Sequence, residues 1–235
     1  LTDVTGVQTC ALPICSDEPW AYLSFSSLTG EGSVLSHCVI ENGGSSGYGM
    51  VYLNTNKTDK LTIDHCTFKN SANYPIYVNL PESLSAIDAT NTYTDNTDNR
   101  IYIGITNLTS DGTMVYAGTP YLFSGNLFIY NSATLTIKPG VELQFKPGAY
   151  IYVGSSSTGT LIAEGTTDEP ITFTSAQAAP KAGDWRGINL VQSDGGSSLL
   201  NAVIEYGANN IYIASSSPVI EKCTIRYGST SGINI

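Results

Sequence analysis

A three-residue strand pattern, aliphatic–variable–aliphatic, recurs along the whole chain. Its central positions are 52, 77, 102, 152 and 212, with looser copies centred on 24, 130, 189 and 234, and successive positions are 22 to 37 residues apart. Repeats of 20–50 residues indicate a solenoid. Because side chains of a strand alternate between its faces, the aliphatic residues are predicted to line a core and the central residues to point outward. If successive copies lie in register, an outward row forms from Tyr52, Tyr77, Tyr102, Tyr130 and Tyr152.

A second pattern predicts a sharp corner between two further strands of each coil. It reads aliphatic, two turn residues, small residue, one residue, large apolar residue, and it occurs at residues 35–40, 63–68, 199–204 and 220–225. The small positions are Cys38, Cys66, Ala202 and Cys223, and they are expected to point inward where the corner narrows the core. The chain has no helical periodicity, and Gly, Asn, Ser and Thr interrupt it every few residues. We therefore predict an all-β fold with three short strands per coil.

The chain also repeats over a longer distance. Residues 20–40 align with residues 185–204 across a single-residue gap, and residues 63–68 align with 220–225 at an offset of 157. This predicts one continuous stack of two modules, at residues 16–107 and 108–235, with further modules of the same chain beyond them. A loop at about residues 175–184 is expected to project from the stack. Trp20 and Trp185 occupy equivalent positions, which favours a packing role at a coil edge.

The first residues are interpreted as foreign to the protein. Residues 4–14, VTGVQTCALPI, resemble the translation of a sequencing-library adapter. We therefore assign residues 1–15 to a non-native, adapter-derived segment and leave them out of the fold. The chain also lacks an initial Met and stops within a predicted strand, so we expect it to be an open-ended piece of a longer protein.

The composition narrows the choice of partners. Only 13% of residues are charged and the net charge is −10, whereas binding to nucleic acid or to an anionic membrane surface needs clustered Lys and Arg. Apolar runs are too short for membrane insertion. Outside the foreign segment the cysteines are Cys38, Cys66 and Cys223, without the spacing of a disulfide framework or a zinc site. Low charge with many small polar residues is typical of a secreted or cell-surface β protein.

The repeated Ile-x-x-Cys-Thr corners and Ile-Tyr-Ile strands resemble those of right-handed parallel β-helix proteins of the pectin-lyase-like superfamily. The stretches at residues 135–141 and 170–174, with Asp184-Trp185, are similar to modules of large bacterial surface or secreted proteins. The resemblance covers residues 20–235 and implies an all-β, right-handed parallel β-helix solenoid of about nine coils of 22–37 residues. In the resembled enzymes, the outer face of the corresponding sheet often forms a glycan groove.

Two functions follow from these patterns. The leading hypothesis is a non-enzymatic, adhesin-like scaffold that binds a polysaccharide or another surface glycan along the tyrosine row. A structural role for the tyrosine row is the competing explanation, because stacked tyrosines also stabilise neighbouring strands. The alternative function is a polysaccharide lyase or glycoside hydrolase whose catalytic coils lie elsewhere in the protein. No cofactor is expected, except Ca²⁺ under the lyase alternative.

Candidate chemical residues are few, and none is predicted to be catalytic. Asp64-His65 is similar to a short Ile-Asp-His segment of pectate lyases, but no Arg-rich segment accompanies it. A hydrolase needs two carboxylates, and Glu205 with Glu221 is the pair expected on adjacent coils. His37 and His65 are expected to stack on adjacent corners. Solvated corner residues are favoured over a two-histidine metal site, so no metal site is predicted. Cys38 and Cys66 are predicted to be free, buried thiols.

Overall fold

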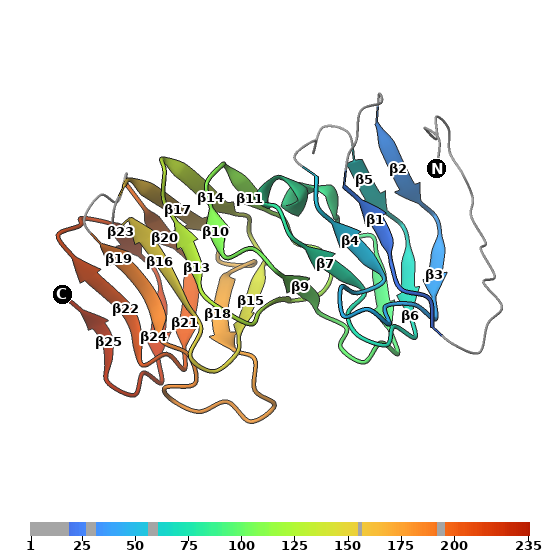
Figure 1. Cartoon of the computed structure of the whole chain (residues 1–235). Helices are drawn as coiled ribbons and strands as arrows, with labels where there is room; N and C mark the ends of the chain where they lie inside the picture. The colour runs from blue at the N-terminus through green and yellow to red at the C-terminus, as the bar shows by residue number, and fades with distance from the viewer. Residues whose placement is uncertain (1–18, 27–31, 56–60, 155–156, 192–195) are drawn as a thin grey trace. The chain divides into compact units, whose positions relative to one another are not determined.

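The computed structural model of the chain describes residues 19–26, 32–55, 61–154, 157–191 and 196–235. The fold is an all-β, right-handed parallel β-solenoid of about eight turns, which confirms the predicted fold class and approaches the predicted nine coils (Figure 1). The adapter-like segment lies outside the described residues. One short 3₁₀ helix, η2 (Pro81–Ala86), is present in the described part of the chain. No helix there is long and apolar enough to cross a membrane.

The chain separates into two compact units. The first comprises Leu1–Gly104 and Ala117–Thr119, and the second comprises Ile105–Tyr116 and Pro120–Ile235. Each unit contributes strands to three parallel sheets, and successive strands of the chain enter the three sheets in turn. The module boundary between residues 107 and 108 stays a prediction.

The first unit contains three sheets of short strands. One contains β1 (Leu23–Phe25), β4 (Val51–Leu53), β7 (Ile76–Val78) and β9 (Ile101–Ile103). The second contains β2 (Ser33–Ser36) and β5 (Leu61–Asp64). The third contains β3 (Val39–Glu41), β6 (Thr67–Lys69) and β8 (Thr92–Thr94). On the next coil η2 follows β7, where the preceding coils have a strand of the second sheet.

The second unit repeats the arrangement with longer sheets. One contains β10 (Asn107–Leu108), β13 (Leu127–Ile129), β16 (Tyr150–Gly154), β19 (Gly187–Val191), β22 (Asn209–Ala214) and β25 (Ser231–Asn234). Another contains β11 (Gly112–Met114), β14 (Ala133–Ile137), β17 (Gly159–Glu164), β20 (Ser198–Leu200) and β23 (Val219–Glu221). The remaining strands of the unit pair with one another in the order β12 (Tyr121–Phe123), β15 (Glu142–Phe145), β18 (Ile171–Ser175), β21 (Ala202–Glu205) and β24 (Thr224–Arg226). The predicted loop joins β18 to β19 and extends from the strands in Figure 1.

The core follows the predicted alternation. In β4 and β7 the outer residues of each triplet, such as Val51 and Ile76, are fully buried, whereas the central tyrosines are partly exposed. Burial of each aliphatic side chain favours folding by about 1.5–3 kcal/mol. The chain therefore fixes its register through the two inward residues and leaves the central position free to vary.

The predicted corners are present, and their backbone explains why two turn residues suffice. The second turn residue has a positive φ at all four corners: 55° at His37, 50° at His65, 46° at Asn201 and 53° at Lys222. This left-handed conformation bends the chain sharply from one sheet to the next, and the following small residue turns into the core. Because His, Asn and Lys all occupy the position, the corner does not require a particular side chain.

The long-period repeat is also visible in the structure. Trp20 forms a bridge with Gly43, and Trp185 forms one with Gly207. Both indole Nε1 atoms donate to a backbone carbonyl, of Glu41 at 2.9 Å and of Glu205 at 2.8 Å. The predicted packing role of the two tryptophans is thus confirmed.

Candidate functional site

The structure divides the predicted tyrosine row between two sheets. Tyr52 pairs with Tyr77, and Tyr77 pairs with Tyr102, in the sheet that contains β4, β7 and β9. Tyr152 lies instead in β16, where its partner on the preceding strand is Phe128. Tyr130 follows the end of β13 and is displaced from that register by two residues. The prediction of one continuous row of five was therefore wrong, and only its first three members share a face.

These three tyrosines belong to a larger group, which we call the tyrosine cluster. It consists of Tyr22, Tyr48, Tyr52, Tyr74, Tyr77 and Tyr102. Neighbouring ring centroids lie 4.7 Å apart for Tyr77–Tyr102, 5.6 Å for Tyr52–Tyr77 and 5.8 Å for Tyr22–Tyr52. The rings thus form one unbroken aromatic surface across four coils.

Sequence reasoning missed half of this cluster. Tyr22, Tyr48 and Tyr74 lie just before β1, β4 and β7, outside the repeated strand triplets. Their rings nevertheless contact the strand tyrosines, with Tyr48 5.0 Å from Tyr52 and Tyr74 4.7 Å from Tyr102. The available signal was their constant spacing of 26 residues, which matches the coil length.

Small and amide side chains border the cluster. Gly104 leaves room for the Tyr77 ring, because a Cβ atom at this position would lie 2.3 Å from its Cε1 and hydroxyl oxygen. Asn54 and Asn79 each follow a row tyrosine by two residues, and Asn79 Nδ2 donates to Asn54 Oδ1 at 2.9 Å. An amide carries both donors and acceptors, and this bond uses only part of that capacity. The cluster therefore combines flat apolar rings with neutral hydrogen-bonding groups.

The phenol groups of Tyr52 and Tyr77 remain protonated. Burial raises the pKa of Tyr52, and the neighbouring Tyr48 and Tyr22 add to the effect. Burial also raises the pKa of Tyr77, assisted by Tyr102, Tyr52 and Tyr48. Both hydroxyls are thus neutral groups that donate and accept hydrogen bonds throughout the physiological pH range.

The second unit carries a separate and smaller aromatic group around Tyr152. Its ring lies 6.0 Å from that of Phe128 and 6.1 Å from that of Tyr150. The guanidinium of Arg186 lies over Tyr150, 5.8 Å from the ring centroid. In the next coils the outward positions in register with Tyr152 are Asn189 and Tyr212, so the aromatic surface is interrupted there.

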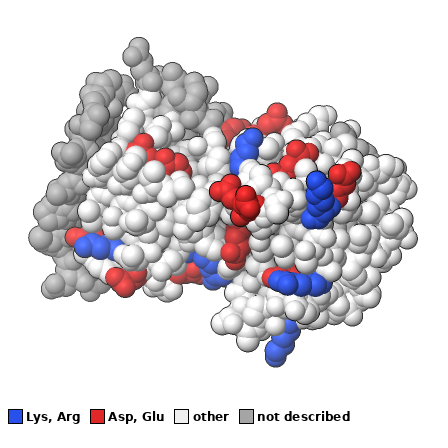
Figure 2. Space-filling model, turned by 180° about the vertical axis from the view of Figure 1, so that it is seen from behind, with Lys and Arg blue, Asp and Glu red and all other residues white. Residues whose placement is uncertain are grey.

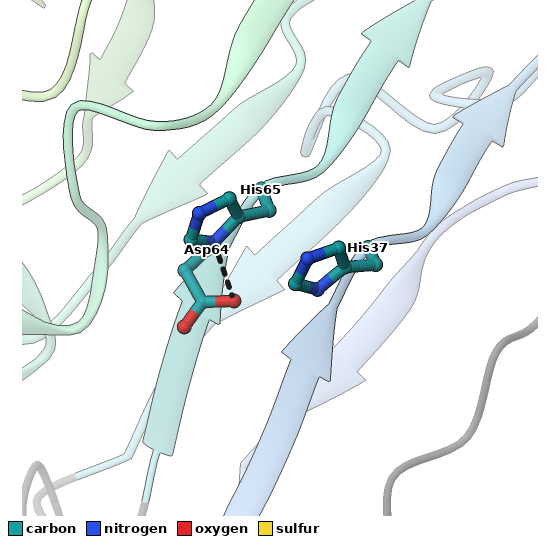
Figure 3. A group of neighbouring side chains, drawn as sticks. All are labelled: His37, Asp64 and His65. Atoms are coloured by element: carbon teal, nitrogen blue, oxygen red, sulfur yellow. Dashed lines mark ion pairs between the residues drawn. The ribbon is translucent and has the colours of Figure 1, made fainter.

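The second group of chemical interest is the histidine–aspartate corner, formed by Ser36, His37, Asp64 and His65. Figure 3 shows His37, Asp64 and His65. The two imidazole rings stack as predicted, with centroids 4.5 Å apart and planes inclined by 5°. The Ser36 hydroxyl donates to Asp64 Oδ1 and lies 2.8 Å from His37 Nδ1. His65 Nδ1 lies 3.4 Å from Asp64 Oδ1. Chiefly because of the Ser36 bond, the pKa of Asp64 is lowered from its usual value.

Cys38 and Cys66 are buried and form no disulfide, as predicted. Cys66 Sγ lies 3.1 Å from the carbonyl oxygen of Asp64 and 3.2 Å from that of Leu35. Cys223, at the equivalent corner, has the same two contacts at 3.3 Å, with Glu221 and Leu199. The sulfur atoms therefore fill the corner core.

Burial of Cys66 predicts a specific pH dependence of stability. Desolvation raises the pKa of its thiol from 9.0 to about 11. The unfolded thiol loses its proton near the lower value, so the stabilising contribution is complete below pH 9.0 and is lost as the pH rises toward about 11. Urea unfolding should show the stability of the chain falling relative to that of Cys66→Ala across this interval. A stability difference that is constant with pH would contradict the assignment.

The two carboxylates considered for hydrolysis do not form a pair. Glu205 ends β21 and Glu221 ends β23, which belong to different sheets. Glu205 is buried, accepts a hydrogen bond from Thr174 Oγ1 at 2.9 Å, and is bound by Arg226 Nε at 2.6 Å. Glu205 and Glu221 thus lie on consecutive coils, as expected, but in different sheets. A carboxylate paired with an arginine in this way has a structural role.

Charged side chains are dispersed over the face shown in Figure 2. Basic groups there lie beside acidic ones, and most of the described surface in this view carries neither. Among the described residues, Lys69 Nζ lies 2.7 Å from Glu41 Oε2 and Arg100 Nη2 lies 2.6 Å from Asp98 Oδ2.

Comparison with known proteins identifies the fold family. The family model described as a pectate-lyase-like β-helix domain matches residues 106–227, which is slightly more than half of the chain. Searches of curated proteins and of solved structures found no match. The match agrees with the parallel coils, the repeated corners and the inward aliphatic triplets described above. The chain belongs to the pectate-lyase-like β-helix family.

Proposed function

We propose that this chain is a non-enzymatic part of a secreted or cell-surface β-helix scaffold that binds a polysaccharide on its tyrosine cluster. The observation that supports the proposal is the unbroken contact of six tyrosine rings across consecutive coils. Sugar rings present C–H groups on their faces, which pack against flat aromatic surfaces, and their hydroxyls bond to neighbouring polar groups. A polymer running across the coils would meet an aromatic residue about every 4.8 Å.

The chemistry around the cluster favours an uncharged polysaccharide. The outward residues of the four strands are Ser24, Tyr52, Tyr77 and Tyr102, and none is charged. Arg100 precedes Tyr102 by two residues, but its Nε and Nη2 atoms bind the Asp98 carboxylate at 2.8 and 2.6 Å. An acidic polymer would gain little from a guanidinium that is already paired.

A purely structural role for the rings is the competing explanation. Each aromatic contact contributes about 0.5–1.5 kcal/mol beyond its buried area, so the rings also stabilise the coils. However, Tyr22 and Tyr48 remain 41% and 45% exposed, and both lie outside the strands that such stacking would join. This exposed aromatic area is what a ligand would cover.

Affinity electrophoresis through gels that contain neutral or acidic polysaccharides tests the proposal. The chain should be retarded by at least one neutral glycan, and Tyr52→Ala/Tyr77→Ala/Tyr102→Ala should lose the retardation. A variant of matched composition, Tyr130→Ala/Tyr152→Ala/Tyr212→Ala, should retain it. Circular dichroism checks that both variants are folded. Equal retardation of the two variants, or none for the chain on any gel, would remove the tyrosine cluster as a binding surface.

The enzymatic alternative is tested with the same glycans. A lyase creates an unsaturated uronate and a hydrolase a new reducing end, so both products are detected by standard assays. We expect neither product to accumulate with this chain. Product formation that survives the tyrosine substitutions would favour an enzyme whose chemistry lies outside the cluster.

A further inference from the structure

We propose that the histidine–aspartate corner binds one divalent transition-metal ion through His37, Asp64 and His65. One nitrogen atom from each histidine and one carboxylate oxygen all lie within 4.8 Å of one another. Two of these side chains belong to one coil and the third to the coil before it, as Figure 3 shows. The proposal concerns a site away from the tyrosine cluster and does not depend on carbohydrate binding.

The backbone brings the three side chains together before any ion binds. Ser36 pairs with Asp64 in the β2–β5 register, and His37 N donates to the Asp64 carbonyl at 3.2 Å. On the next coil, His65 N donates to Thr90 Oγ1 at 2.8 Å. Both histidines share the same left-handed backbone conformation, so their Cβ atoms point the same way and their rings stack. Binding of a metal ion therefore requires little further ordering of the backbone.

The side chains can make the small movement that coordination needs. Metal bonds of about 2.0–2.2 Å require the ligand atoms to approach more closely than they do here, with each ring turned toward the ion. The His65 side chain is 52% exposed and His37 is also exposed, so both rings can rotate about their side-chain bonds. Three protein ligands with water in the fourth position is a common arrangement for Zn²⁺.

The Ser36 hydroxyl orients two of the proposed metal ligands, His37 and Asp64, through hydrogen bonds. Its single hydroxyl proton goes to Asp64 Oδ1, so its oxygen is left to accept from His37 Nδ1. His37 then carries its proton on Nδ1 and presents the lone pair of Nε2. Hydrogen bonds of this kind orient ligands and typically affect metal affinity by about 10–100-fold. Two imidazoles with one carboxylate suit Zn²⁺, Cu²⁺ or Ni²⁺ better than Ca²⁺, which prefers six or more oxygen atoms.

The equivalent corner of the second unit shows that the histidines are not needed for the fold. There, Leu200, Asn201, Glu221 and Lys222 stand where Ser36, His37, Asp64 and His65 stand in the first unit, and Asn201 and Lys222 have the same backbone conformation. The first corner thus carries an imidazole pair and a hydroxyl that corner geometry does not explain. The second corner also supplies a control, His37→Asn/His65→Lys, whose residues are known to fit.

The test is titration of the untagged full chain with Zn²⁺, followed by calorimetry and by NMR of the imidazole groups. The chain has only two histidines, so both sets of signals report on this site. We expect one equivalent of Zn²⁺ to shift both sets, and Ser36→Ala to bind about tenfold more weakly. His37→Asn/His65→Lys should unfold at the same temperature as the chain and lose this equivalent. Unchanged Zn²⁺ binding in that double variant, or signals of only one histidine shifting, would overturn the proposal.

Discussion

Replacement of Trp185 with alanine is expected to lower the free energy of unfolding by about 3–5 kcal/mol. The indole is fully buried and stacks on Phe145, with ring centroids 4.2 Å apart and planes inclined by 8°. Its Nε1 atom donates to the carbonyl oxygen of Glu205. The substitution removes the stacking, opens a large cavity and takes away the hydrogen-bond donor of a buried carbonyl.

Trp20 provides an internal comparison for this prediction. It has the same bridge to a glycine and the same indole hydrogen bond, but it is only partly buried. In urea unfolding, Trp20→Ala should therefore lower the free energy of unfolding clearly less than Trp185→Ala does. Equal losses of unfolding free energy in the two variants would show that the stability contribution of the indole comes mainly from the shared hydrogen bond and not from the buried stacking on Phe145.

Gly187→Ala is expected to be the most damaging single-methyl substitution, with a loss of about 3 kcal/mol or more. Gly187 lies in β19 with φ at +105°, a conformation that L residues rarely adopt. A Cβ atom there would lie 1.7 Å from the carbonyl oxygen of Asn209 and 2.9 Å from that of Asn210. Both oxygens belong to the backbone of β22, so the clash with the added methyl group can be relieved only by separating the paired strands β19 and β22.

Gly125→Ala is the matched control, because a Cβ atom at this exposed position meets nothing within 4 Å and φ is not positive. Its unfolding free energy should stay within about 0.5 kcal/mol of that of the unchanged chain. Thermal unfolding followed by circular dichroism compares the two variants directly. A Gly187→Ala variant as stable as Gly125→Ala would contradict the close strand approach at Gly187.

The side chains that face the core were predictable from the sequence, because burial restricts which residues can occupy those positions. The corner at residues 63–68 specifies an inward aliphatic residue, a two-residue turn and a small inward residue. The stacked histidines followed from the same alignment, since side chains at equivalent corners point the same way. The packing of both tryptophans followed from their places in the long repeat.

The arrangement of the outward-facing side chains was less predictable, because a three-residue strand pattern does not specify the sheet to which its strand belongs. Tyr102 and Tyr152 each lie between two β-branched aliphatic residues, yet β9 and β16 belong to different sheets. The lengths of the intervening turns decide the assignment. At Tyr130 the adjacent aliphatic Ile129 supported a register in which Tyr130 points outward, whereas pairing with β16 puts Phe128 in that position.

Tyr22, Tyr48 and Tyr74 were missed for a related reason. They precede strands, where no alternation applies, and their side chains reach the cluster only because the coils bring those turns beside the sheet. The paired state of Glu205 was equally hidden, since it depends on Arg226 in the next coil. Contacts between coils are set by register, which a single sequence constrains only through its inward residues.

The most direct measurement of the central claim is ¹⁹F NMR of the chain with its 15 tyrosines replaced by 3-fluorotyrosine, in the presence and absence of the retarding glycan. Single Tyr→Phe substitutions assign the signals. Binding on the tyrosine cluster predicts that the resonances of Tyr48, Tyr52, Tyr77 and Tyr102 shift while those of Tyr152 and Tyr212 stay in place. Shifts confined to Tyr150 and Tyr152, or no shift in the cluster while the glycan is bound, would contradict it.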